Sequence, residues 1–146
     1  MQPHPVAAAI AAAVARRDPQ QLAAALTETV RLRALLPGGL IESHGRANVA
    51  DCLPSLLADF DTVELLESAG EDVADRLLIH YRLGVSQGTT HWVCTQTAVC
   101  KVVDERLAVI NLLCSGFREV DHDDHVATLS GTASRGTAPP GARLLG

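Results

Sequence analysis

Aromatic residues and lysine are scarce in this sequence, and it contains no apolar run of transmembrane length. Aromatics make up 3% of the 146 residues although 47% are apolar, so any core must rest on leucine, valine and alanine. Lys101 is the single lysine and the net charge is −5, which argues against binding to nucleic acid or to an anionic membrane. The alanine-rich segment 6–15 is too short to cross a bilayer, and no basic n-region of a signal peptide precedes it. We therefore expect a cytoplasmic protein.

The four cysteines form no C-x-x-C pair, which removes the simplest metal or redox motif. Cys94 and Cys100 are predicted on one strand, where six residues span about 20 Å, too far for a disulfide. Free thiols, mostly buried, are the expected state. The segment 121–125 (DHDDH) has metal-compatible side chains but no pre-organised geometry. We expect neither a metal site nor a cofactor.

Three long strands dominate the second half of the chain. The segments 76–85, 91–103 and 106–117 are rich in branched residues, contain no proline, and are separated by the turns 86–88 and 104–105. Shorter strands are predicted at 29–36, 40–44 and 62–68. Helices are predicted at 6–17, 19–26 and 48–60, the last with Pro54 as a kink. The order predicts an α+β domain over 1–119, and the loss of apolar periodicity predicts a disordered tail over 120–146.

Four segments in this order resemble the nuclear transport factor 2-like superfamily, which includes the SnoaL-like domains. They are 15–19 (ARRDP), 30–32 (VRL), 44–49 (HGRANV) and 102–107 (VVDERL), with Glu105 standing where the family usually carries glycine. The resemblance implies a cone-shaped fold, in which N-terminal helices pack on a curved, mostly antiparallel sheet, with a pocket between them and often a homodimer. The superfamily holds isomerases, cyclases, dehydratases, epoxide hydrolases and binding modules, so the fold alone does not choose a function.

The turn at 104–105 predicts that Thr97 lies opposite Leu112 and Thr95 opposite Cys114, on one face of the sheet. Resemblance to the ketosteroid isomerases implies that this face lines the pocket and also carries His80 and Arg82. His80 is the candidate general acid or base, and Cys114 would be a nucleophile if it met His80. The candidate ligand-binding residues are Arg82, His91, Thr95, Thr97, Leu112 and Cys114.

The alternate residues of the first long strand form its more apolar face: Leu77, Ile79, Tyr81 and Leu83. If they point away from the pocket, a homodimer through the outer sheet face must cover them. The predicted dimer face carries Tyr81, Trp92, Gln96, Leu113 and Phe117. The alternative is a monomer in which Leu77–Leu83 point inward and His80 and Arg82 face solvent.

Neither familiar mechanism of this superfamily has its residues here. By the resemblance, Leu36 stands at the isomerase base position and Thr97 at the strand aspartate, and the three long strands hold no carboxylate for epoxide opening. We therefore predict binding of a small, largely apolar organic molecule in the cone, with an acidic group if Arg82 contacts it. Lyase- or isomerase-type chemistry is left open. The alternative is a non-catalytic homodimeric module with a vestigial pocket.

Overall fold

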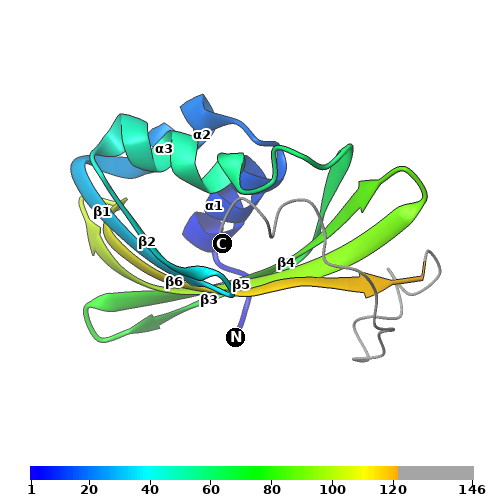
Figure 1. Cartoon of the computed structure of the whole chain (residues 1–146). Coiled ribbons are helices and arrows are strands. Elements are labelled where there is room, and N and C mark those ends of the chain that lie inside the picture. Colours follow the sequence, from blue (N-terminus) through cyan, green and yellow to red (C-terminus); the bar gives the residue numbers. More distant parts are fainter. Residues whose placement is uncertain (122–146) are drawn as a thin grey trace.

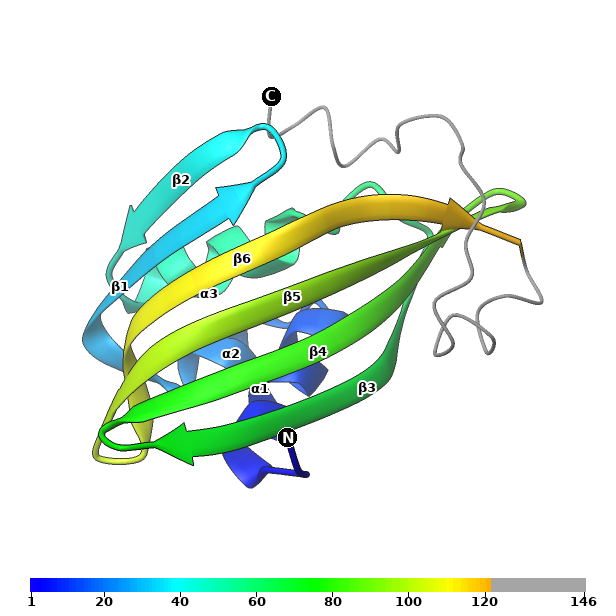
Figure 2. The ribbon, with the colours of Figure 1, turned by 90° about the horizontal axis from the view of Figure 1, so that it is seen from below.

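The protein is built on one six-stranded sheet that curves around three helices. The computed structural model describes residues 1–121 of the chain. The strands, in chain order, are β1 (Leu26–Leu36), β2 (Gly39–His44), β3 (Thr62–Val73), β4 (Arg76–Gln87), β5 (Thr90–Val103) and β6 (Arg106–Val120). Their order across the sheet is β2-β1-β6-β5-β4-β3, and only the β1–β6 pair is parallel. Figure 2 shows the sheet from its outer side, with the helices behind it.

The helices α1 (Pro5–Ala15), α2 (Pro19–Ala23) and α3 (Arg46–Ser55) lie in the concavity of the sheet (Figure 1). Proline opens α1 and α2, where its missing N–H costs nothing, and Asp18 caps α2 by accepting from the N–H groups of Gln20 and Gln21. The α+β class, the curved sheet and the helical cover are confirmed. No helix in the described part of the chain is long and apolar enough to cross a membrane.

In the turn between β5 and β6, Glu105 has a backbone conformation that glycine would adopt more easily. Asp104 and Glu105 both adopt left-handed backbone angles, with φ of 51° and 64°, and so form a two-residue hairpin turn. Val103 pairs with Arg106, as the sequence predicted. Beyond the Val102–Leu107 pair the predicted register is wrong, because Ala108 bulges out of β6 between the Val102–Leu107 and Lys101–Val109 pairs.

Because of the bulge, the residues of β6 that follow Ala108 share a face with a different set of β5 residues than the sequence predicted. Thr97 pairs with Leu113 rather than Leu112, and Cys114 pairs with Gln96 rather than Thr95. A shift of one residue moves every following side chain of a strand to the opposite face. The prediction that Thr95 and Thr97 share a face with Leu112 and Cys114 is therefore wrong.

The face of the sheet that meets the helices is the apolar one. On β4 the inward-facing side chains are Leu77, Ile79, Tyr81, Leu83 and Val85, each no more than 1% exposed. The proposed dimer face was wrong as a set: Tyr81, Trp92 and Gln96 are in the core, Phe117 packs against it, and Leu113 is 56% exposed on the other face. The predicted tail 120–146 and the motif at 121–125 lie almost entirely outside the described residues.

Candidate functional site

The residues predicted as a site from the sequence are divided between the two faces. Leu112 and Cys114 lie on the inner face, both almost fully buried. The others occupy the outer face of β4 and β5: His80, Arg82, His91, Thr95 and Thr97. The hypothesis that His80 and Arg82 meet Cys114 in the cone is wrong, because one strand presents alternate residues to opposite sides.

His80 is the centre of a polar chain on the outer face. Its Nε2 lies 3.2 Å from Glu67 Oε1 and its Nδ1 3.2 Å from Thr97 Oγ1. A carboxylate only accepts, so the neutral ring donates from Nε2 to Glu67 and accepts the Thr97 hydroxyl at Nδ1. The His80 side chain is 26% exposed, and it faces away from the helices. This arrangement orients the imidazole, while Arg82 lies beside it, opposite Glu67 and Thr95 in the ladder.

The cone interior holds a polar cluster that the sequence reasoning placed outside it. The Tyr81 hydroxyl donates to Gln96 Oε1, and both side chains are at most 2% exposed. Burial is the main cause that raises the pKa of Tyr81 well above its usual value, so the phenol stays protonated. The signal that could have found this cluster was the apolar alternation of 77–83, which sets Tyr81 inward.

Among the residues that the structure describes, none of the buried side chains in this interior is a carboxylate. Among the described residues, the buried polar or charged side chains besides tyrosine and cysteine are Ser86 and Gln96. Leu36, at the position that the resemblance matches to an isomerase base, is 3% exposed in the core. A general base working on a carbon acid would have to come from elsewhere.

A cleft of about 580 Å³ opens between the helices and the sheet, and we call it the helix–sheet cleft. Its walls come from α1, the end of α2 and the inner face of the sheet. The apolar residues that line it are Pro5, Val6, Ala9, Ala24, Ala25, Leu77 and Val102. The polar residues at its rim are His4, Gln21, Asp72 and Glu105. Its size and apolar lining with few polar groups fit a small organic ligand.

The rim of the helix–sheet cleft is acidic. His4 Nδ1 accepts from the N–H of Val6, which places the proton of the neutral ring on Nε2, 3.3 Å from Asp72 Oδ2. Glu105 adds a second carboxylate, and neither arginine nor lysine lines the cleft among the residues described. The electrostatic preference of the cleft is therefore for a cation.

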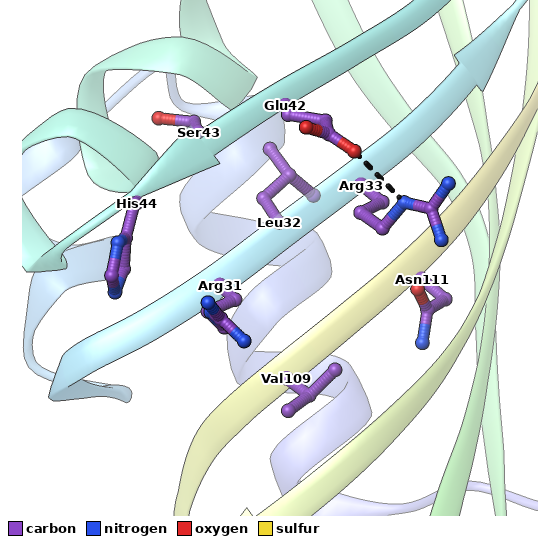
Figure 3. Close-up of a pocket in the computed structure, with 8 residues that line it drawn as sticks. All are labelled: Arg31, Leu32, Arg33, Glu42, Ser43, His44, Val109 and Asn111. Carbon is purple, nitrogen blue, oxygen red and sulfur yellow. Dashed lines mark ion pairs between the residues drawn. The ribbon is translucent and has the colours of Figure 1, made fainter.

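A second hollow, of about 520 Å³, lies on the outer face over β1, β2 and β6; we call it the outer groove (Figure 3). Arg31, Arg33 and His44 bring cationic or protonatable groups, with Asn111 and Val109 beside them. Arg33 Nε lies 3.1 Å from Glu42 Oε1, but both side chains are more than 60% exposed, so the pair adds little stability. The groove is thus a positively biased surface next to an edge of the sheet.

Comparison with known proteins identifies the architecture. A protein from Catenulispora acidiphila with a ketosteroid isomerase-like fold, solved in complex with trimethylamine, is 16% identical and superposes with a TM-score of 0.63. The match covers 77% of this chain and 85% of that one. The chain has the nuclear transport factor 2-like fold.

Two further structures support the nuclear transport factor 2-like assignment. A protein from Xanthomonas campestris assigned as a polyketide cyclase is 19% identical, with a TM-score of 0.58 over 75% of this chain and 87% of that one. An LEH-like epoxide hydrolase from M. tuberculosis is 15% identical, with a TM-score of 0.57 over 76% of this chain and 80% of that one. No family model and no curated protein sequence matches the chain.

Proposed function

We propose that this nuclear transport factor 2-like domain binds a small, largely apolar molecule with a cationic amine in the helix–sheet cleft. The observation that carries the proposal is the combination of an apolar lining with Asp72 and Glu105 at the rim. The earlier expectation of an acidic ligand depended on Arg82, which lies on the other face of the sheet. A structural neighbour solved with trimethylamine supports the same ligand class at the level of the fold.

The apolar walls supply most of the affinity in this proposal, and the carboxylates supply selectivity. Burying apolar ligand surface contributes about 25 cal/mol per Å², whereas an exposed ion pair contributes roughly 0.2–1 kcal/mol. Asp72 is 76% exposed, so its attraction is of the weaker, screened kind. The domain then binds by shape and selects by charge, and the proposal includes no catalytic step.

Matched probes with one ring and different charges test this assignment. Cyclohexylamine should bind more tightly than cyclohexanol, and cyclohexanecarboxylate most weakly, in titrations followed by amide chemical shifts. The double variant Asp72→Asn/Glu105→Gln should weaken cyclohexylamine binding about three- to tenfold and leave cyclohexanol unchanged, as expected for two exposed carboxylates. Raising the salt concentration should also weaken cyclohexylamine binding, because salt screens the attraction between exposed charges.

Filling the cleft provides the matched control. Ala9 is exposed on α1 and lines the cleft, whereas Ala8 is exposed on the same helix and does not line it. Ala9→Phe should abolish binding of all three probes, and Ala8→Phe should change nothing. Shifts that map elsewhere, or an Ala9→Phe variant that binds normally, would refute the site.

The outer face supports a second role, as a homodimer interface. Leu40, Leu35 and Leu113 occupy paired positions on β2, β1 and β6, each at least 50% exposed. On this face Arg31 and Arg33 lie on β1, near one edge of the sheet. Three glutamates lie on β3, at the other edge: Glu64, Glu67 and Glu71. A twofold axis would therefore place the arginines of one copy against the glutamates of the other. We propose a dimer formed this way, with the acidic strand of one copy at the outer groove of the other.

Sedimentation velocity tests the dimer at tens of micromolar protein. Leu113→Asp should raise the dissociation constant at least about tenfold, because it buries a charge at the centre of an apolar contact. Val73→Asp is the control, since Val73 is 51% exposed at the β3–β4 turn and outside the leucine row. A wild-type monomer under these conditions would contradict the proposed interface.

A further inference from the structure

Two cysteines from neighbouring strands face each other inside the cone. Cys94 on β5 and Cys114 on β6 have their Sγ atoms 3.5 Å apart, and they are 0% and 6% exposed. A disulfide has an S–S distance of about 2.05 Å, so the two sulfur atoms would have to move about 1.5 Å closer to form one. The other thiols, Cys52 and Cys100, have no such partner among the described residues.

A bulge in the β5–β6 ladder brings these thiols together. Between the Cys94–Phe117 and Gln96–Cys114 pairs the register shifts, and the Thr95 N–H bonds to the Ser115 hydroxyl. Gly116, with φ of 80°, turns its N–H toward Cys114 Sγ at 3.5 Å. Bulges commonly re-aim side chains beside functional sites.

The two sulfurs are chemically unequal. Cys114 Sγ is approached by the Gly116 N–H and by Gln96 Nε2 at 3.6 Å, in addition to Cys94. The hydrogen bond from Cys94 is the main cause that lowers the pKa of Cys114 to about 6, while the pKa of Cys94 is raised. Cys114 is therefore the sulfur of the pair that loses its proton more readily.

Gln96 is itself held in the orientation that serves a thiolate. The Tyr81 hydroxyl donates to Gln96 Oε1, which leaves the amide NH₂ as the group that faces Cys114. Tyr81 and Gln96 thus act as positioning residues: they supply a hydrogen-bond donor to the sulfur through a fully buried connection from β4 to β6.

We propose that Cys114 and Cys94 form a redox site at which a small hydroperoxide is reduced and the two thiols become a disulfide. The Cys114 thiolate attacks the peroxide oxygen, the O–O bond breaks, and the alkoxide or hydroxide leaves and takes up a proton as alcohol or water. Cys114 is then a sulfenic acid. The Cys94 sulfur attacks it, the S–O bond breaks, and the hydroxyl leaves with the Cys94 proton as water. Two thiols lose two electrons, and the peroxide gains them.

A lowered pKa raises the thiolate fraction of Cys114 but also lowers the intrinsic nucleophilicity of its sulfur, so the two effects partly cancel in the reaction rate. The identity of the product therefore tests the site better than the rate does.

The experiment uses the full reduced chain, which has four cysteines in all, and a small excess of hydrogen peroxide. Remaining thiols are alkylated under denaturing conditions and the protein is analysed by intact mass and peptide mapping. The expected product has one intramolecular bond joining Cys94 to Cys114, two alkylated cysteines at positions 52 and 100, and full recovery of four thiols with dithiothreitol. Four unmodified thiols, or a bond between any other pair, would overturn the site.

Single cysteine variants distinguish the sulfur that attacks the peroxide, Cys114, from the sulfur that then forms the disulfide, Cys94. Cys94→Ser should stop at a Cys114 sulfenic acid, which dimedone traps. Cys114→Ser should leave Cys94 reduced under the same treatment, and Cys52→Ser should give the wild-type disulfide. Peroxide oxidation of Cys94 in the Cys114→Ser variant at the wild-type rate would contradict the assignment of Cys114 as the attacking sulfur.

Discussion

Leu83→Ala is expected to lower the free energy of unfolding by about 3–4 kcal/mol, among the larger effects available in this chain. Leu83 is 0% exposed on the inner face of β4, under the helices. Truncation to alanine removes three carbons of buried side chain and leaves a cavity that the surrounding strands fill only in part. Chemical denaturation followed by the fluorescence of Trp92, the single tryptophan, measures the change.

Leu78→Ala is the matched control on the same strand. Leu78 is half-buried and faces outward with its neighbours in the ladder, Val99 and Glu71. Its truncation should cost about 1 kcal/mol or less at protein concentrations low enough to keep the chain monomeric. A larger loss for Leu78→Ala than for Leu83→Ala would reverse the assignment of the two faces.

Gly116→Ala is expected to destabilise the fold by about 2–4 kcal/mol, from two separate causes. Its φ of 80° lies in the left-handed region, which costs a residue with a Cβ about 1 kcal/mol. The added Cβ would also lie 2.6 Å from Cγ of Pro37, so the proline ring or the backbone has to shift. Thermal and denaturant unfolding both report the loss.

Gly88→Ala measures the backbone part of that effect alone, so the difference between the two variants gives the steric part. Gly88 also has a left-handed backbone, with φ of 60°, but no atom lies within 4 Å of the position of an added Cβ. Its substitution should cost only about 1 kcal/mol. Equal losses for the two variants would show that Pro37 yields and that backbone conformation alone sets the cost.

The order and type of the elements could be predicted from the sequence because the local signals agree. Branched residues without proline predicted β4, β5 and β6 to within a few residues, and Asp18-Pro19 marked the start of α2. The boundaries were less accurate where local signals are weak. The helix predicted over 48–60 ends at Ser55, one residue after Pro54, and the strand predicted over 62–68 continues to Val73.

The faces of the sheet could not be predicted with the same ease, because the position of a bulge has no local signature. Ala108 looks like any strand residue, yet it alone moves Thr97 from Leu112 to Leu113 and so separates the predicted site. The apolar alternation of Leu77, Ile79, Tyr81 and Leu83 was the more reliable indicator, since burial follows hydrophobicity more closely than it follows family resemblance. The acidic cleft depends on residues from distant segments, His4, Asp72 and Glu105, which only the fold brings together.

The parallel pairing of β1 with β6 has a consequence for synthesis on the ribosome. Leu32 pairs with Ile110, so the β1–β2 hairpin emerges long before the strand that completes the sheet beside it. Until β6 is released from the exit tunnel, β1 presents an unpaired edge whose inward residues, Val30, Leu32 and Ala34, have no sheet to join. Closing so long a loop is slow compared with forming local hairpins. We expect β3, β4 and β5 to pair as they emerge, whereas the β1–β2 hairpin joins the sheet only after β6 is made and its open edge can aggregate until then.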